Sequence, residues 1–131
     1  MSGLEPIWID PPEVLALHER LLALHGGASG VRDEGLSHSA LARPGQRASY
    51  VENADVVDLA VACTAGIVRN HPFVDGNKRT GFLIGILFLE LNGYRFTAPE
   101  TTTTNAVLAL AAGTLDEAGY TAFLRANVEP E

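Results

Sequence analysis

Apolar residues recur every three or four positions along most of this chain, which is the spacing of a helix with one buried face. The first such stretch follows Asp10, a typical N-cap residue, and two prolines suited to a first helical turn. It ends at Gly26-Gly27, and its predicted buried face consists of Val14, Leu17, Leu21, Leu22 and Leu24. The preceding residues 7–9 are expected to be extended and to pack on the body of the protein.

Two further stretches have wider apolar faces. Residues 55–69 predict a second helix, which ends at Asn70 because a proline follows two residues later. The stretch from about 77 to 92 is apolar all round and therefore predicts a central, buried helix. Glycine is disfavoured inside a helix by about 1 kcal/mol relative to alanine. We therefore expect Gly81 and Gly85, four residues apart, to allow close packing by a neighbouring helix.

The rest of the chain predicts shorter elements. These are a helix at about 36–42, a polar loop or small hairpin at 45–54, a link at 94–97, a helix at 100–112 and a last helix to about 127. The sequence Thr114-Leu115-Asp116-Glu117 matches a capping box, which places the start of the last helix there. Because strand content is small, we predict an all-α fold: one domain over residues 1–131, a compact bundle around a central helix, with at most a small flap or hairpin.

Composition supports a globular protein of 131 residues, with 47% apolar and 19% charged residues. The net charge of −7 argues against direct binding to nucleic acid. Cys63 is the single cysteine, so an internal disulfide is excluded and a reducing compartment is expected; it lies in an apolar stretch and should be buried. We see no secretion signal and no apolar run long enough to span a bilayer, and we expect a soluble, cytoplasmic protein.

The residues best suited to chemistry lie together, just before the central helix, in the stretch His71-Pro72-Phe73-Val74-Asp75-Gly76-Asn77-Lys78-Arg79. Lys78 is the only lysine in the chain, and it falls with Arg79 in the first turn of the helix. Positive side chains at this end oppose the helix dipole. Because free N–H groups at a helix N-terminus bind anions, we interpret the two cations as part of a phosphate site.

The other residues of this stretch supply what such a site needs. A histidine such as His71 can accept a proton near neutral pH, and Asp75 is a hard oxygen ligand suited to Mg²⁺ beside substrate phosphates. Gly76 allows a close approach to the backbone, and Asn77 can cap the helix or donate from its amide. Together they suit phosphoryl or nucleotidyl transfer. The structural alternative is an ordinary helix stop and turn, in which a lone histidine has no catalytic role.

The sequence HPFVDGNKRTG at residues 71–81 resembles the central motif of the Fic/Doc superfamily, HPFx(D/E)GNxR. Residues 30–44 resemble the N-terminal signature of its death-on-curing (Doc) type members, and Asn92-Gly93-Tyr94 resembles the end of their central helix. The resemblance extends over residues 7–125. It implies a small helical bundle that transfers part of a nucleotide to a protein hydroxyl.

The resemblance also implies roles for single residues. His71 would deprotonate the target hydroxyl, and Asp75 would hold Mg²⁺. Gly76 and Asn77 would form the anion hole, and Arg79 would bind a phosphate. These remain expectations at the level of the sequence.

Lys78 distinguishes two types of member, because AMP-transferring Fic enzymes have glycine at this position. A lysine would fill the space that the outer phosphates of ATP need in the AMP-transferring pose. The resemblance thus implies a Doc-type toxin that uses ATP and Mg²⁺ to phosphorylate a Ser or Thr of a translation factor, such as elongation factor Tu, and that a small antitoxin neutralises. The alternatives are an AMP transferase with Lys78 moved aside, and a non-catalytic member that only binds a nucleotide or a partner.

Several residues outside the motif leave alternatives open. Arg32 and Asp33 could reach the nucleotide or the target, or could pin their own loop through a local ion pair. Residues 45–54 could form a flap that docks the target by strand addition, or a plain surface loop. His18 and His25 are expected at the surface or half-buried. The chain has no (S/T)xxxE(G/N) inhibitory motif of self-regulating Fic proteins, so control is expected from a separate protein.

Overall fold

The computed structural model of the chain describes residues 6–32, 35 and 55–131. The predicted helix at 36–42, the predicted loop or flap at 45–54 and Asp33 lie outside the described residues. In the described ranges the elements are α1 (Pro11–His25), α3 (Val56–Asn70), α4 (Asn77–Leu91), β1 (Tyr94–Phe96), α5 (Glu100–Ala112), α6 (Glu117–Ala126) and β2 (Val128–Pro130). The predicted helical bundle is confirmed.

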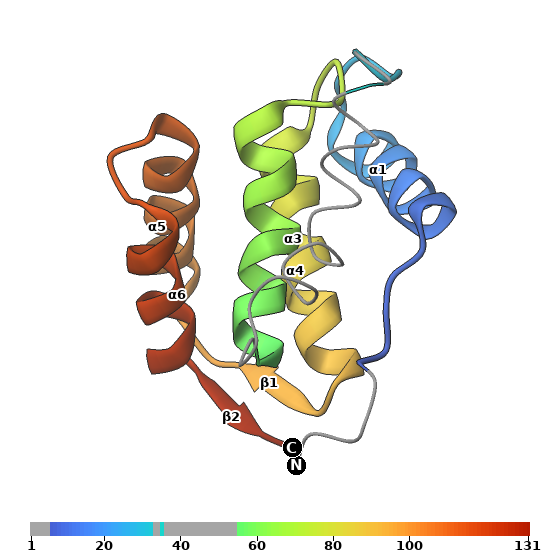
Figure 1. The fold of residues 1–131 in the computed structure, drawn as a ribbon. Coiled ribbons are helices and arrows are strands. Elements are labelled where there is room, and N and C mark those ends of the chain that lie inside the picture. Colours follow the sequence, from blue (N-terminus) through green and yellow to red (C-terminus); the bar gives the residue numbers. More distant parts are fainter. Residues whose placement is uncertain (1–5, 33–34, 36–54) are drawn as a thin grey trace.

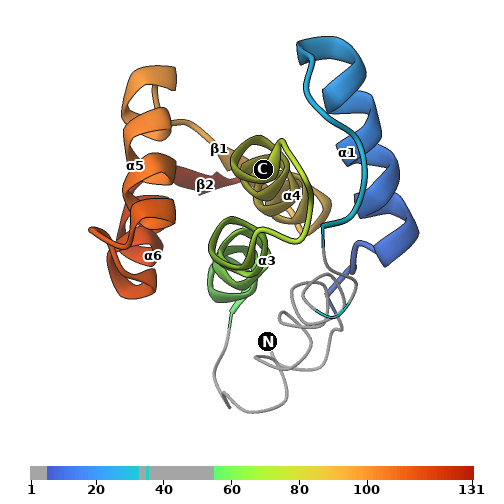
Figure 2. The same cartoon turned by 90° about the horizontal axis from the view of Figure 1, so that it is seen from above.

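Helices α3 and α4 form the centre of the molecule, with α1 on one side and α5 and α6 on the other (Figures 1 and 2). The central place predicted for α4 agrees with this arrangement. However, α3 is the more completely buried of the two, since every residue from Leu59 to Val68 is buried. Helix α4 keeps an exposed strip that includes Lys78 and Arg79 at its beginning. That strip brings the cations of the motif to the surface.

Close packing between α3 and α4 depends on the two glycines of α4. A Cβ added at Gly85 would lie 2.2 Å from Thr64 Oγ1, and one added at Gly81 would lie 2.7 Å from Val68 Cγ1. The Thr64 hydroxyl donates a hydrogen bond of 2.8 Å to the carbonyl of Gly81, so a polar bond joins the helices inside the core. The predicted reason for the two glycines is therefore confirmed.

Two predictions for the C-terminal part were wrong. Residues 94–97 were predicted to be a link, but Tyr94–Phe96 form β1, which pairs antiparallel with β2. This strand could not be read locally because its hydrogen-bonding partner comes from the end of the chain. The N-cap of α6 is Asp116, whose carboxylate accepts from the backbone N–H of Gly119 at 2.7 Å. Thr114, the predicted cap, instead donates its backbone N–H to Ala109 and thereby closes α5.

The N-terminal residues pack as predicted. Trp8 lies against Phe88 of α4, with ring centroids 5.6 Å apart, and the backbone of Ile7 exchanges two hydrogen bonds with the Asn92 side chain. These contacts attach the segment before α1 to the end of α4. No helix in the described part of the chain combines the length and the apolar character needed to cross a membrane.

Candidate active site

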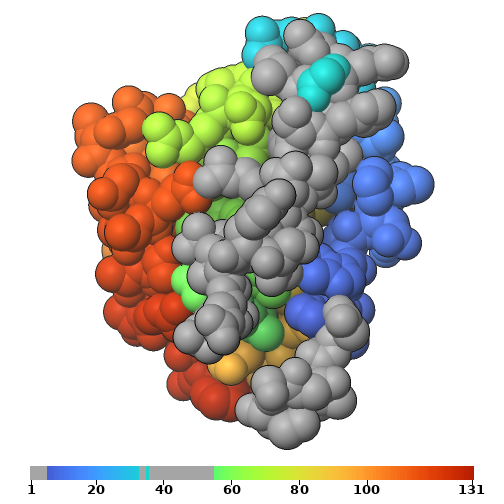
Figure 3. All heavy atoms as spheres, viewed as in Figure 1, coloured from blue at the N-terminus to red at the C-terminus, as the bar shows by residue number. Residues whose placement is uncertain are grey.

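The motif residues His71–Gly76 form the loop between α3 and α4, called the motif loop below. It lies at one end of the central helix pair, beside the residues that follow α1, and part of it reaches the surface (Figures 1 and 3). A hollow of about 310 Å³ opens here, lined by His71, Val74, Asp75, Gly76, Asn77, Lys78 and Arg79. The fold thus brings all six predicted site residues to one cavity.

His71 occupies an unusual backbone position. It is the C-cap of α3 and has φ 50° and ψ 56°, which is the left-handed region. Histidine, asparagine and aspartate are the non-glycine residues that adopt this conformation most readily. The turn ends α3 and leaves the half-buried imidazole at the wall of the hollow.

Arg32 holds this turn from outside the motif. Its Nε donates to the carbonyl of His71 at 2.7 Å and its Nη2 donates to the carbonyl of Asn70 at 3.0 Å. The last carbonyls of a helix have no partner within the helix, and a cation is favourable beside them. The two contacts give Arg32 a role that was not predicted, because the guanidinium caps the end of α3. The predicted ion pair with Asp33 lies outside the described residues.

The backbone around Arg32 strengthens the same junction. Its N–H donates to the Pro72 carbonyl at 2.7 Å, and the N–H of Val74 donates to the Gly30 carbonyl at 3.0 Å. Val31 and Phe73 form an isolated antiparallel bridge between these two bonds. The segment after α1 therefore runs beside the motif loop and fixes its first half.

We expect the Arg32→Ala variant to carry out the predicted phosphoryl or nucleotidyl transfer about 10- to 100-fold more slowly, because small displacements of a catalytic group lower rates by such factors. Single-turnover kinetics with saturating nucleotide would measure the effect. Arg32→Lys should lie in between, since one ammonium cannot span both carbonyls, and Arg20→Ala, at an exposed position of α1, is the matched control. An unchanged rate in Arg32→Ala would show that the turn holds without the guanidinium.

Phe73 and Asn77 brace the second half of the motif loop. The Phe73 side chain is 1% exposed and packs in the hydrophobic core, which anchors the loop. Asn77 accepts from the N–H of Phe73 and donates to its carbonyl, both at 3.0 Å. Its amide oxygen and one amide N–H are thus bonded inside the loop, while the N-cap of α4 is Gly76. The Asn77 side chain therefore braces the loop, and Asn77 is also among the residues that line the hollow.

The beginning of α4 is suited to an anion. The first turns of α1, α3, α5 and α6 each contain an acidic residue, whereas that of α4 contains none and has Lys78 and Arg79 instead. The first N–H bonded within α4 is that of Thr80, so the N–H groups of the three preceding residues have no partner inside the helix. Both the side chains and the backbone of this turn therefore favour a negatively charged ligand.

Asp75 is the carboxylate of the hollow. Its Oδ1 accepts from the N–H of Gly76 at 2.8 Å, and its Oδ2 lies 3.4 Å from the N of Ala28. The described residues contain no cluster of three or more His, Cys, Asp or Glu side chains able to enclose a metal ion. Mg²⁺ commonly uses one or two carboxylates and takes its other oxygens from substrate phosphates and water. Asp75 therefore fits an ion that arrives with a nucleotide.

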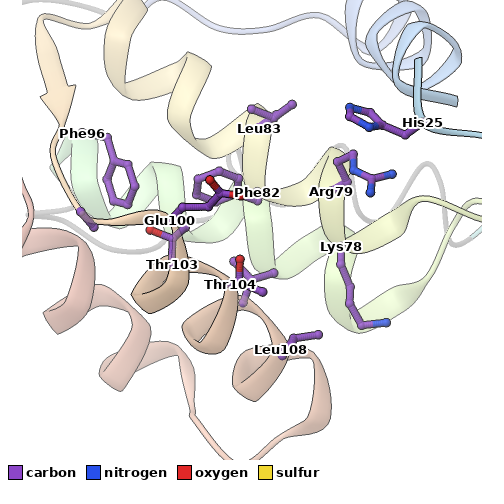
Figure 4. Close-up of a pocket in the computed structure, with 12 residues that line it drawn as sticks. His25, Lys78, Arg79, Phe82, Leu83, Phe96, Glu100, Thr103, Thr104 and Leu108 are labelled. Atoms are coloured by element: carbon purple, nitrogen blue, oxygen red, sulfur yellow. The ribbon is translucent and has the colours of Figure 1, made fainter. Parts of the chain in front are cut away.

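A second, larger groove adjoins the hollow and shares Lys78 and Arg79 with it (Figure 4). Its volume is about 650 Å³, within the range of small-molecule sites. One wall comes from α4 and the other from α5, and the groove is lined mainly by apolar side chains and threonines, among them Phe82, Leu83, Thr103, Thr104 and Leu108. The two cations thus stand between a polar hollow and an apolar groove.

His18 was not predicted to contact the site. It was expected at the surface or half-buried, but it is 2% exposed and packs beneath the motif loop. Leu24, expected on the buried face of α1, is 70% exposed. The burial of His18 could have been predicted from its spacing, because Val14, His18 and Leu22 are four residues apart and share one helical face.

Cys63 does not contribute a nucleophile. It is buried in α3, as predicted, and burial raises the pKa of its thiol to about 12. The reactive form of cysteine is the thiolate, which is therefore suppressed at neutral pH.

Comparison with known proteins agrees with this geometry. The sequence profile of the Fic/DOC family matches residues 8–89, more than half of the chain. The chain belongs to the Fic/DOC family. It is 34% identical over 93 residues to the protein kinase doc of Escherichia phage P1, covering 70% of this chain and 74% of the phage protein. It is 43% identical over 75 residues to the toxin Doc of Mycolicibacterium smegmatis, covering 56% of this chain and 57% of that protein. The resemblance to Doc-type members is confirmed.

Proposed function

We propose that this protein is a Doc-type toxin that transfers the γ-phosphate of ATP to a Ser or Thr hydroxyl of a translation factor. The observation that carries the proposal is the single hollow in which the His71 imidazole, the Asp75 carboxylate and the cationic N-terminus of α4 meet. Support for a kinase comes from Lys78, the residue typical of Doc-type members, and from the phage relative named a protein kinase. Elongation factor Tu is the target that the family resemblance suggests.

In the proposed reaction His71 accepts the proton of the target hydroxyl. The hydroxyl oxygen then forms a bond to the γ-phosphorus, the bond from that phosphorus to the β,γ-bridging oxygen breaks, and ADP leaves. Backbone N–H groups at the start of α4 and the Lys78 and Arg79 side chains stabilise the negative charge of the phosphoryl group. Mg²⁺, held by Asp75 and the phosphates, would neutralise charge on the leaving group. The apolar groove beside Lys78 has room for the nucleoside.

The decisive experiment compares two labels. The protein is incubated with a bacterial lysate and ATP carrying ³²P at either the α or the γ position. We expect a labelled lysate protein only with the γ label. Transfer of the α label alone would replace the kinase assignment with AMP transfer, and transfer of neither would contradict both enzymatic assignments.

AMP transfer remains the second candidate, and one observation favours it. Lys78 is exposed, and within the described residues no hydrogen bond or ion pair fixes its side chain in one position, as a side chain that moves aside requires. The α label distinguishes this candidate from the kinase in the same experiment.

Lys78 offers a direct test of nucleotide binding, because it is the only lysine. Reductive methylation with ¹³C-formaldehyde should give one dimethyl-lysine signal besides that of the α-amino group. We expect ATP with Mg²⁺ to shift this lysine signal and, when added first, to slow the modification several-fold, because a bound phosphate shields the ammonium. Adenosine, which lacks phosphates, is the control. Equal modification with and without ATP would contradict a phosphate at Lys78.

We further propose that a separate antitoxin controls the activity, since toxin Doc is among the relatives and the chain has no inhibitory motif. A protein encoded beside this one should reduce transfer of the γ label when it is purified and added in equal amount.

A further inference from the structure

His18 makes a specific polar contact beneath the motif loop. Its Nε2 lies 2.7 Å from the carbonyl oxygen of Asp75, and its ring stacks on Phe73 with centroids 3.8 Å apart and planes within 12°. Histidine is rarely so buried without a partner for each ring nitrogen. Nδ1 lies 3.7 Å from the carboxylate of the neighbouring Glu19.

The contact defines the position of a proton. A carbonyl oxygen only accepts hydrogen bonds, so Nε2 must be the protonated nitrogen of the ring. This donor draws the Asp75 carbonyl toward α1. In a trans peptide the carbonyl and the following N–H point in opposite directions, and the chain contains no cis peptide in its described part. The N–H of Gly76 therefore points away from α1.

The N–H of Gly76 already faces an anionic oxygen. It donates to Asp75 Oδ1 at 2.8 Å, and both Asp75 and Gly76 line the hollow. Gly76 has φ 78°, in the region that glycine adopts without strain. Because glycine accepts many backbone conformations, the Asp75–Gly76 peptide could turn over if nothing held its carbonyl. The carbonyl oxygen would then enter the hollow and repel a phosphate.

We propose that His18 is a positioning residue that keeps the Asp75–Gly76 peptide in the orientation that directs the Gly76 N–H at the phosphate. The proposal rests on the proposed function only for the identity of the anion. His18 is not among the described residues that line the hollow, so it acts through the peptide. If His18 were only an ordinary buried core residue, ligand affinity would not depend on its hydrogen bond. As a positioning residue, it must keep the hydrogen bond to the Asp75 carbonyl for the ligand to bind tightly.

Two variants separate the hydrogen bond from the packing. His18→Phe keeps a flat ring on Phe73 but removes the donor, whereas His18→Gln has an amide N–H that reaches the same carbonyl but loses the stack. We expect His18→Phe to bind Mg·ATP about 10-fold or more weakly by calorimetry, because a misdirected anion-hole donor is costly. His18→Gln should stay within about 3-fold of the wild type, even if its melting temperature is the lower of the two. The proposal would be overturned if both variants bound Mg·ATP with equal affinity, or if the loss of affinity followed the loss of melting temperature.

A measurement on the unchanged protein makes the test independent of whether the variants fold. Long-range ¹H–¹⁵N correlation should show His18 Nε2 protonated, and addition of Mg·ATP should shift the Gly76 amide signal. A proton on Nδ1 alone would overturn the proposal. If the wild type binds Mg·ATP with these signatures but transfers no label, the proposed function fails while the role of His18 stands. If it transfers label and His18→Phe does so with the same KM for ATP, only the role of His18 fails.

Discussion

Replacement of His71 by asparagine is expected to lower the rate of phosphate transfer by about 10²- to 10⁴-fold, the usual contribution of a general base. His71 has φ 50°, and asparagine tolerates this left-handed conformation, so the motif loop should keep its shape. His71 is half-buried and is not part of the hydrophobic core, so the loss of its ring should disturb the core little. The initial rate of γ-label transfer and the melting temperature, measured side by side, test both parts of this prediction.

His71→Ala is the matched variant. Alanine also removes the base but is strained at positive φ, at a cost of about 1–2 kcal/mol in the free energy of unfolding. The two variants should therefore share the loss of rate and differ in melting temperature. Expression of the wild type should arrest growth, and both variants should relieve the arrest. If His71→Asn transfers label at the wild-type rate, the imidazole is not the base; growth arrest that persists in both variants points to a non-catalytic member.

The largest expected effect on stability lies in the centre of the molecule, at Gly85. A methyl group there would lie 2.2 Å from Thr64 Oγ1 and 3.1 Å from the carbonyl oxygen of Ala60, so α3 and α4 must separate or Thr64 must turn. Overpacking of this kind costs about 1–3 kcal/mol. Because alanine is favoured over glycine in a helix by about 1 kcal/mol, the net loss in Gly85→Ala identifies the close packing as the cause. Urea denaturation of Gly85→Ala measures the change.

A double-mutant cycle locates the clash. Thr64→Ala removes the nearest atom, and the remaining Thr64 Cβ lies at an ordinary contact distance of 3.6 Å from the added methyl group. Gly85→Ala should thus cost less in the Thr64→Ala background than in the wild type, although Thr64→Ala alone loses the hydrogen bond to Gly81. Additive losses would show that Thr64 is not the obstacle, and a Gly85→Ala protein more stable than the wild type would contradict the close approach itself.

The structure explains why the sequence predicted some parts of the site and not others. Lys78 and Arg79 were correctly predicted to lie in the first turn of α4. This prediction needed only the position at which the helix starts and the charges of the residues that follow, and both are local properties of the sequence. The contacts of His18 and Arg32 were not predicted, because each side chain bonds to a backbone carbonyl distant in sequence, 57 and 39 positions away. The spacing of Val14, His18 and Leu22 marks His18 as part of the buried face of α1, but the carbonyl to which it bonds leaves no pattern in that neighbourhood.

The amino-acid sequence by itself determined the helical class, the positions of α1, α3, α4 and α5, and the nine-residue stretch that contains the site, since helical periodicity, capping residues and the motif are all local properties. The tertiary structure alone decided that Tyr94–Phe96 is a strand, that the Asn77 side chain braces the loop, and that His18 and Arg32 hold the two ends of the motif loop. The strand and the contacts of His18 and Arg32 depend on the packing of α1, the segment that follows it or the C-terminus against α3 and α4, and such contacts exist only once the chain has folded. The bonds of Asn77 to Phe73 span only four residues, but they depend on the shape of the folded loop.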